Sequence, residues 1–308
     1  MQEIFNSILP TVIVIFIFIA IGFILNKIKF VDDHTEKQMS KILLYVVNPA
    51  LIINTYQRPY SSGMLRGLLI AFALALLSHI VGIVVSTIFV RRGSELAVER
   101  FSVVYSNCGF MAFPIIAAFV PENGLFYAGA YVTIFNLLSW THGLFLMSGE
   151  KNIKTTLRSL FSPALISICL GLTMFFLQFT LPKIPADVIE KLAAINTPMA
   201  MIIAGVGLGR AGIFNTIRPS RAYIVSMLRL LVVPFVMIII LKFLPVSSEL
   251  INTNLIATCC PIGASIVLFS NMCNKDSLYA SKLVALSTLF SLGTIPLMLI
   301  FSKFVFAL

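Results

Sequence analysis

Long runs of apolar residues, rather than alternating apolar and polar positions, dominate the pattern along the chain. About ten runs of about 20 residues each are separated by short segments that carry the charged residues, Gly and Pro. A run of this length is typical of a helix that spans a lipid bilayer. We therefore predict an all-α polytopic membrane protein with ten transmembrane helices, near residues 8–26, 35–55, 67–90, 98–119, 124–147, 159–180, 188–209, 221–243, 252–271 and 277–304.

Composition strengthens this prediction and excludes most soluble classes. Of the 308 residues, 59% are hydrophobic and 11% are charged, whereas about 25% of a soluble domain is charged. The net charge of +10 would favour nucleic acid in a soluble protein, but these basic residues are scattered through short loops. We expect a lipid bilayer around the chain and no nucleic-acid partner. The start of the chain has no basic segment, so the first apolar run is expected to remain as helix 1.

Cysteine usage predicts neither a disulfide framework nor a metal site, and we expect no cofactor. The five cysteines lie in or beside apolar runs, without C-x-x-C spacing and without histidine at ligand spacing: Cys108, Cys169, Cys259, Cys260 and Cys273. The sequence also has no grouping of Ser, His and Asp and no phosphate-binding loop, so we expect that the protein is not an enzyme.

Basic residues are distributed unequally between the two sets of alternating loops. Fifteen lie on one side, namely Lys27, Lys29, Lys37, Lys41, Arg91, Arg92, Arg100, Lys151, Lys154, Arg158, Arg210, Arg218, Arg221, Lys275 and Lys282. Six lie on the other side, namely Arg58, Arg66, Lys183, Lys191, Lys242 and Lys303. Because cytoplasmic loops carry the excess of Lys and Arg, we predict that the first side is cytoplasmic. Both termini would then be extracellular, in a multi-pass protein of the plasma (inner) membrane.

The two halves of the chain carry signs of duplication. The pattern Asp33-x-x-Glu36-Lys37 recurs as Asp187-x-x-Glu190-Lys191, an offset of 154 residues, which is half of 308. We interpret each as a helix start, with the Asp as N-cap and the Glu three residues further on. Five helices per half is an odd number, so the halves must have opposite orientations. We predict an inverted repeat with domains at residues 1–154 (helices 1–5) and 155–308 (helices 6–10).

Helices 4 and 9 each contain a segment that is unsuited to an unbroken helix. Residues 106–114 read Ser-Asn-Cys-Gly-Phe-Met-Ala-Phe-Pro, and residues 257–265 read Ala-Thr-Cys-Cys-Pro-Ile-Gly-Ala-Ser. Pro removes a backbone donor and Gly permits an unwound backbone, which a membrane tolerates only where it is buried in protein or lines a polar cavity. We predict that both helices are broken and cross. The alternative is a pair of ordinary proline kinks.

A crossing of this kind predicts an anion site. Two half-helix N-termini would point their free N–H groups and positive dipole ends into one cavity, which suits a carboxylate. Asn107 would add an uncharged donor. The candidate substrate-binding residues are Asn107, Gly109, Pro114, Cys260, Pro261, Gly263 and Ser265, together with Asn48 and Pro49 of helix 2.

Three further residues within the apolar runs are candidates for chemistry. Arg229 lies about two turns into helix 8, where it would either snorkel to the interface or act as a counter-charge for the anion. His79 and His142 lie in helices 3 and 5. They are candidates for a proton relay, although a histidine that hydrogen-bonds between helices is the commoner case.

Several motifs follow one another along nearly the whole chain, namely Tyr45-Val46-Val47-Asn48-Pro49-Ala50-Leu51-Ile52, Asn107 to Pro114, Gly205-x-Gly207-Leu208-Gly209, Cys259 to Phe269, Leu286-Ser287-Thr288 and Pro296. Their order resembles the auxin efflux carrier family, which contains plant auxin exporters and bacterial transporters of malate, malonate and similar anions. The long loop between helices 5 and 6 of many plant members is absent, so the chain looks like a bacterial-type member.

The resemblance implies an arrangement of domains and a position for the substrate. Helices 1, 2, 6 and 7 would form a scaffold domain that makes a homodimer, and helices 3–5 and 8–10 would form a transport domain. Helices 4 and 9 would cross at the site. Asn107 matches the substrate-binding Asn of the family, and Pro114 and Pro261 fall in its crossover segments.

From these observations we expect a secondary transporter of small organic anions that works by elevator-type alternating access. One alternative is a membrane sensor or receptor subunit that binds a small carboxylate without moving it, which the lack of an appended signalling domain disfavours. Another is a cation or proton antiporter of similar architecture. It would need acidic ligands near the membrane centre, but all twelve Asp and Glu residues read as loop or helix-end positions.

The predicted orientation can be tested in intact cells. A cysteine introduced at Asn152, after replacement of the native cysteines, should react with membrane-permeant thiol reagents only, because the loop of residues 148–158 is expected in the cytoplasm. Labelling of this cysteine by an impermeant reagent added outside would reverse the assignment.

Overall fold

The chain folds into a bundle of helices. A computed structural model describes residues 2–120, 122–149, 163–211 and 220–306, and these parts contain no strand. Its elements are α1 (Gln2–Lys27), α2 (Asp33–Ile42), η1 (Leu43–Val47), α3 (Asn48–Tyr56), α4 (Ser62–Phe89), α5 (Leu96–Val104), α6 (Ala112–Phe119), α7 (Gly124–Leu138), η2 (Ser139–Gly143), α8 (Leu144–Ser148), α10 (Pro163–Phe176), α11 (Lys183–Ala194), α12 (Asn196–Ala211), α14 (Ser220–Met227), η3 (Leu228–Val232), α15 (Val233–Lys242), α16 (Ser248–Cys259), α17 (Ser265–Met272) and α18 (Ser277–Phe306).

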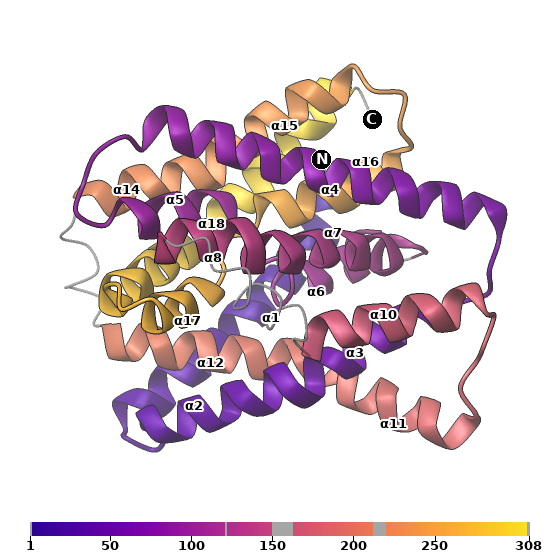
Figure 1. The fold of residues 1–308 in the computed structure, drawn as a ribbon, viewed down its shortest axis with the longest axis horizontal. Helices are drawn as coiled ribbons and strands as arrows, with labels where there is room; N and C mark the ends of the chain where they lie inside the picture. The colour runs from indigo at the N-terminus through magenta and orange to yellow at the C-terminus, as the bar shows by residue number, and fades with distance from the viewer. Residues whose placement is uncertain (1, 121, 150–162, 212–219, 307–308) are drawn as a thin grey trace.

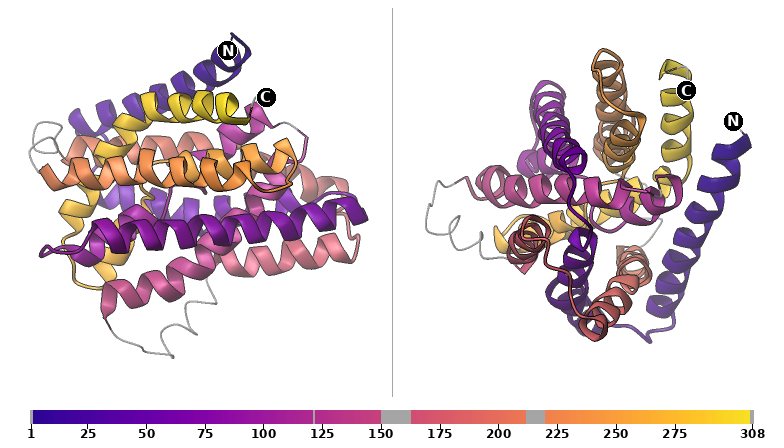
Figure 2. Two further views of the ribbon diagram at one scale, coloured as in Figure 1. Left: turned by 90° about the horizontal axis from the view of Figure 1, so that it is seen from above. Right: turned by 90° about the vertical axis from the view of Figure 1, so that its right-hand side faces the viewer.

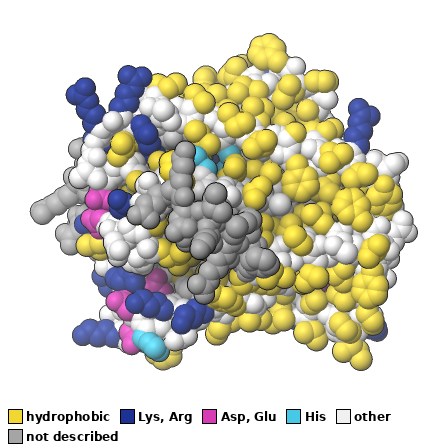
Figure 3. Space-filling view, in the orientation of Figure 1, with side chains coloured by type: hydrophobic (Ala, Val, Ile, Leu, Met, Phe, Trp, Pro, Cys, Tyr) yellow, Lys and Arg dark blue, Asp and Glu magenta, His cyan; other side chains and the backbone are white. Residues whose placement is uncertain are grey.

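The helices run mainly along one axis, and the loops between them collect at its two ends. The loops from α1 to α2 and from α4 to α5 lie at the left end in Figure 1, whereas those from α3 to α4 and from α10 to α11 lie at the right end. Figure 2 shows α4, α15 and α18 as neighbouring, nearly parallel helices when the bundle is viewed from its right-hand side. Hydrophobic side chains cover most of the face in Figure 3, and charged side chains gather towards its left end.

This arrangement confirms the all-α polytopic fold. Each predicted membrane segment coincides with described helices, except that residues 159–162 of the sixth lie outside the described residues. Five described helices are long and apolar enough to cross a membrane, namely Ser62–Phe89, Gly124–Ser148, Lys183–Arg210, Arg221–Lys242 and Ser277–Phe306. The total of ten crossings therefore stays a prediction. Lys151, Lys154, Arg158 and Arg218 of the loop count, and the boundary at residues 154 and 155, also lie outside the described residues.

Three π-helical turns interrupt the long helices, and proline explains two of them. A proline inside a helix clashes with the carbonyl of the residue four positions earlier and leaves that carbonyl without a helical partner. The residue four positions before Pro49 lies in η1, and the residue four positions before Pro234 lies in η3. The extra residue of a π-helical turn therefore accommodates each proline. The third turn, η2, contains His142.

The two acidic patterns prove not to be equivalent helix starts. Asp32, not Asp33, is the N-cap of α2: its carboxylate accepts the N–H of Thr35 at 2.8 Å, which lowers the pKa of the Asp32 carboxyl. The interpretation of Asp187 as an N-cap is wrong, because α11 already begins at Lys183, directly after Pro182. The first turn of a helix has free N–H groups and therefore tolerates proline, so the helix can begin in the proline-containing segment before Asp187.

The described helices pack in two groups. One contains α1, α2, α3, α10, α11 and α12, in which α1 packs along α12 and α3 packs against α10 and α11. The other contains the helices from α4 to α8 and from α14 to α18, with α7 between α4 and α16. The groups touch where α1 and α12 meet α18, where α1 meets α6, and where α3 and α10 meet α7.

Glycines allow α1 and α12 to approach each other closely. A Cβ on Gly205 would lie 2.0 Å from the Ile19 carbonyl oxygen, and a Cβ on Gly22 would lie 2.0 Å from the Ile202 carbonyl oxygen. The Gly205-x-x-x-Gly209 spacing predicts close helix packing. The structure confirms that prediction, since Gly209 also packs against the Asn26 side chain.

This contact generates a stability prediction. Gly205→Val should lower the free energy of unfolding by about 1–3 kcal/mol or more, because the new side chain meets rigid backbone of α1. Thermal unfolding of the purified protein in detergent measures the loss. Gly293→Ala is the matched control: a Cβ there meets no described atom within 4 Å, and the change should be neutral or add about 0.5–1 kcal/mol. Equal midpoints for the two variants would contradict the prediction.

Candidate functional site

Two broken helices cross inside the second group of helices. The first consists of α5 and α6, separated by residues 105–111, and the second consists of α16 and α17, separated by residues 260–264. The unwound segments run antiparallel and pair as a single bridge between Ser106 and Ile262. The Asn107 N–H donates to the Pro261 carbonyl at 2.7 Å, and the Gly263 N–H donates to the Tyr105 carbonyl at 3.0 Å. The predicted breaks and their crossing are therefore confirmed.

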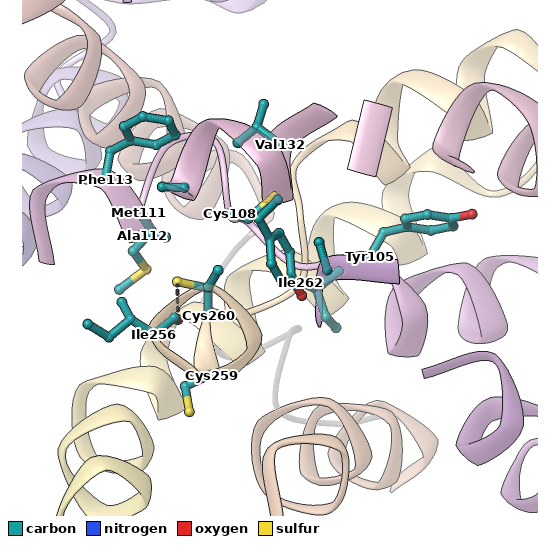
Figure 4. Packing of buried hydrophobic residues seen from close by; sticks show 14 of the residues in the cluster. Tyr105, Cys108, Met111, Ala112, Phe113, Val132, Ile256, Cys259, Cys260 and Ile262 are labelled. Carbon is teal, nitrogen blue, oxygen red and sulfur yellow. Dashed lines mark hydrogen bonds between the residues drawn. The ribbon is translucent and has the colours of Figure 1, made fainter. Parts of the chain in front are cut away.

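Side chains pack tightly around the crossing. Figure 4 shows Cys108, Ile262 and Cys260 gathered where the two unwound segments meet, whereas Tyr105 points away from them. Cys259 and Cys260 point in different directions, and the Cys260 thiol donates to the Ile256 carbonyl at 3.3 Å. The thiols of Cys108, Cys259 and Cys260 are buried and unpaired. They therefore fill space at the crossing.

The two candidate glycines differ in their surroundings. A Cβ on Gly263 would lie 3.0 Å from the Ser106 carbonyl oxygen, so the absence of a side chain lets the two backbones approach. A Cβ on Gly109 would meet no described atom within 4 Å. Gly109 and its neighbour Phe110 are partly exposed. The first unwound segment thus has accessible space on the side of Gly109.

Polar donors at the crossing are left without protein partners. Asn107 as a whole residue is 7% exposed, and its side-chain amide, which keeps some access to solvent, forms no hydrogen bond with any described residue. Helices α6 and α17 both start without a side-chain cap. In the described part of the chain, the N–H groups of Ala264 and Ser265 also have no acceptor, and Ala264 is exposed. A buried amide and two positive helix ends are therefore available to an anion.

Arg229 connects the C-terminal ends of α5 and α16, the first halves of the two broken helices. Its guanidinium is buried, with 1% of the residue exposed. It donates to the carbonyls of Val103 and Val104 at 3.1 Å, to the carbonyl of Cys260 at 3.3 Å and to the carbonyl of Thr258. These carbonyls lie at the C-terminal ends of α5 and α16, where a cation is favourable. The interpretation of Arg229 as a snorkelling side chain is therefore wrong.

The two membrane histidines lie on either side of Tyr105, which directly precedes the crossing. His79 is 1% exposed, its Nδ1 lies 2.7 Å from the Ala75 carbonyl oxygen, and its ring packs against Tyr105 and Tyr131. The Nδ1 of His142 lies 2.9 Å from the Tyr105 hydroxyl. The Nε2 of His79 is buried and has no described partner. A proton relay through these groups stays a prediction.

Asn48 and Pro49 occupy the start of α3, and no described hydrogen bond joins Asn48 to the crossing. The residue that does reach the crossing from the first group of helices is Asn196, at the start of α12. Its Nδ2 donates to the Gly109 carbonyl at 3.4 Å, whereas its Oδ1 is buried without a described partner. The sequence interpretation missed Asn196. A signal was present, because an Asn close to a proline interrupts helix 7, as Asn48-Pro49 interrupts helix 2.

A chain of polar side chains also leads from the crossing towards the N-terminal ends of α4, α7 and α16, and the sequence interpretation missed it. Ser78 donates to the Asn254 amide oxygen at 2.9 Å, and Thr258 donates to Ser78 at 3.3 Å. The Tyr131 hydroxyl lies 3.4 Å from the Thr258 hydroxyl. A small pocket opens beside this chain, lined by Ala71, Tyr127, Tyr131, Leu250, Thr253 and Asn254.

Glu99 is the most buried acidic residue of the second group among the described residues, and the neighbouring Glu95 also has one buried oxygen, Oε2, without a described partner. It lies in the first turn of α5, and its side chain is 2% exposed. Arg221 donates to both of its oxygens, at 2.8 and 2.6 Å, and the Tyr279 hydroxyl donates at 3.0 Å. The sequence identifies Glu99 as a helix-end residue but does not reveal its burial. The paired carboxylate belongs to the end of the bundle where α5, α14 and α18 begin, rather than to the crossing.

A polytopic helical bundle with two broken helices crossing at unpartnered donors has the features of a membrane transport protein. A family model described as "Membrane transport protein" matches residues 7–154 and again residues 150–299. The chain belongs to this family, which includes the auxin efflux carriers, so the resemblance inferred from the motifs is confirmed.

Two archaeal proteins are similar over almost their whole length. An uncharacterized transporter of Methanothermobacter thermautotrophicus is 25% identical over 304 residues, which cover 96% of this chain and 98% of that protein. An uncharacterized transporter of Methanocaldococcus jannaschii is 22% identical over 308 residues, which cover 94% of this chain and 97% of that protein.

The role of Arg229 in holding the crossing can be measured. Arg229→Met should lower stability by several kcal/mol, because each buried carbonyl that loses its donor costs about 1–3 kcal/mol. In a Cys169→Ser/Cys273→Ser background, the buried thiols of Cys108, Cys259 and Cys260 should begin to react with N-ethylmaleimide under native conditions. Arg66→Gln, a change at an exposed arginine of α4, is the control. An unchanged unfolding midpoint with unreactive thiols would show that Arg229 does not hold the crossing.

Proposed function

We propose that this protein is a secondary transporter of small organic anions that works by elevator-type alternating access. The observation that carries the proposal is the buried, unpartnered Asn107 amide between the uncapped starts of α6 and α17. A carboxylate placed there would accept hydrogen bonds from the amide and from the free N–H groups of the helix ends.

Charge at the crossing supports an anion rather than a cation as substrate. Arg229 supplies one buried positive charge, and none of the described ion pairs involves it. Glu99 is engaged by Arg221 at the inner end of α5. A cation carrier would place unpaired carboxylates beside the crossing, and the described residues place none there. The antiporter alternative therefore lacks the side chains it would need.

The packing supports a rigid scaffold and a moving body. In this proposal the group of α1, α2, α3, α10, α11 and α12 is the scaffold, and the group that contains the crossing moves. Few polar contacts join them: Asn196 donates to the Gly109 carbonyl at 3.4 Å, and Arg58 donates to the Glu122 carbonyl at 2.6 Å. The Asn196 bond contributes about 1 kcal/mol net and the charge-assisted Arg58 bond about 1.5–3 kcal/mol, so both are weak enough to exchange during sliding.

The orientation and assembly follow from the same proposal. Both termini would be extracellular in a plasma membrane, and the scaffold helices would form a homodimer. A monoanion that leaves an inside-negative cell gains about 2.3 kcal/mol per 100 mV, so uniport would run outwards. Net uptake would require a co-transported proton or exchange against another anion.

A panel of carboxylic acids tests the proposal. Malate, malonate, an amino-acid-derived acid and an aromatic carboxylate should be screened for thermal stabilisation of the purified protein, because a ligand at 100 times its dissociation constant adds about 2.7 kcal/mol. Acids that stabilise the protein should then show counterflow in proteoliposomes. Saturable binding without counterflow would favour the sensor alternative.

Asn107 variants locate the site. Asn107→Ala should weaken the binding of a stabilising acid by roughly ten- to a hundredfold, because a charge-assisted hydrogen bond contributes about 1.5–3 kcal/mol. Asn107→Asp should weaken binding further, since it places a like charge beside the carboxylate, and mild acid should relieve this defect. Binding titrations on folded, purified variants measure both effects. Unchanged affinity in the two variants would place the site elsewhere.

A further inference from the structure

The charge of Arg229 is buried without a counter-ion. Its hydrogen bonds go to four backbone carbonyls, which are dipoles and carry no net charge. The described ion pairs belong to Arg210 and Arg221 and use Asp33, Glu36 and Glu99. A full positive charge therefore sits within the helices around the crossing.

Arg229 is fixed to the crossing and must move with it. Its guanidinium bridges the ends of α5 and α16, and its own turn, η3, packs against α4, α5, α16 and α18. If the crossing moved without Arg229, all four carbonyls would lose their donor, and the buried charge would lose its hydrogen-bond acceptors in an apolar interior. The two therefore form one rigid unit.

Other charged residues of this group lie close to the ends of their helices. Arg66, Arg100 and Lys282 lie within the first two turns of α4, α5 and α18, and Lys242 and Lys303 lie in the last turns of α15 and α18. Arg229 alone, among the charged residues described in this group, lies near the middle of a membrane segment, Arg221–Lys242. The membrane field therefore acts mainly on Arg229 when the group moves.

We propose that the body carrying the crossing is a cationic carrier, with one fixed positive charge when empty and no net charge when it holds a monocarboxylate. This inference rests on the proposed function. An inside-negative potential would pull the empty body towards the cytoplasm and leave the monocarboxylate-loaded body unaffected. The potential would thus drive the return step of an exporter, and a bound dicarboxylate would add a net negative charge that drives the loaded step outwards.

The displacement can be measured without any organic anion. Fluorophores on Glu122→Cys, in the loop between α6 and α7, and Thr180→Cys, in the loop between α10 and α11, would report the relative position of the two groups by energy transfer. Both positions are exposed. Exposed Cys169 and half-buried Cys273 would be replaced by Ser, whereas the buried cysteines can stay. Proteoliposomes with a potassium gradient and valinomycin impose the potential.

The potential should shift the energy transfer of the substrate-free protein. The ratio of the two orientations should change by at most about tenfold per 60 mV, the limit for one charge that crosses the whole field. Arg229→Gln should abolish the dependence. Asn107→Asp, which keeps Arg229 but adds a compensating negative charge to the same body, should abolish it as well. Asn107→Ala and Arg66→Gln should retain it, and Arg229→Lys should retain it where the protein folds.

The outcomes separate this inference from the proposed function. Counterflow of an acid from the panel without a potential-dependent shift would overturn the cationic carrier and leave the transporter standing. A shift that persists in Asn107→Asp would assign the moving charge to another residue and would also overturn it. If Arg229→Gln fails to fold, the result for Asn107→Asp alone decides whether the moving charge belongs to Arg229. Absence of both counterflow and shift would remove the proposed function and this inference together.

Discussion

Backbone that leaves a helix inside a membrane must find hydrogen-bond partners within the protein, and this constraint organises the crossing. Each unwound segment supplies hydrogen-bond partners for some backbone groups of the other. The Asn107 N–H donates to the Pro261 carbonyl, and the Gly263 N–H donates to the Tyr105 carbonyl. Arg229 then satisfies the carbonyls at the C-terminal ends of α5 and α16. Without these contacts, two broken helices would expose unpaired polar groups in an apolar interior, at a cost of several kcal/mol for each group.

The crossing is asymmetric in its electrostatics. Arg229 occupies the two negative helix ends, whereas the positive starts of α6 and α17 have no side-chain cap. Arg229 therefore offsets the negative helix ends, whereas the positive helix ends are left without a counter-charge from a side-chain cap. Asn107 adds a neutral donor to this positive region. In the proposed anion carrier, recognition by dipoles and one fixed charge would bind the anion weakly enough for release.

Close backbone packing within the first group of helices contrasts with the small number of polar contacts between the two groups. Gly22 and Gly205 bring α1 and α12 so close that even a methyl group would collide with backbone. Between the two groups of helices the described polar contacts are few, and the one at the crossing, from Asn196 to the Gly109 carbonyl, is long at 3.4 Å. In the proposed mechanism, the first group would be the scaffold and the second group would be the body that slides past it.

The sequence by itself determined the features that depend on local chemistry. The apolar runs determined the helices, the Pro and Gly residues determined where helices 4 and 9 break, and the Gly205-x-x-x-Gly209 spacing determined a close helix contact. Only the tertiary structure decided which groups meet across distant segments. It showed that the Arg229 side chain donates to buried carbonyls instead of extending to the membrane–water interface. It also showed that Glu99 is buried against Arg221 and that Asn196 reaches the crossing. Hydropathy and proline affect the backbone over one or two helical turns, so their effect can be predicted from a single run of residues. Asn196, Arg221 and Arg229 each bind a group more than 80 residues away, and packing between distant segments decides such partners.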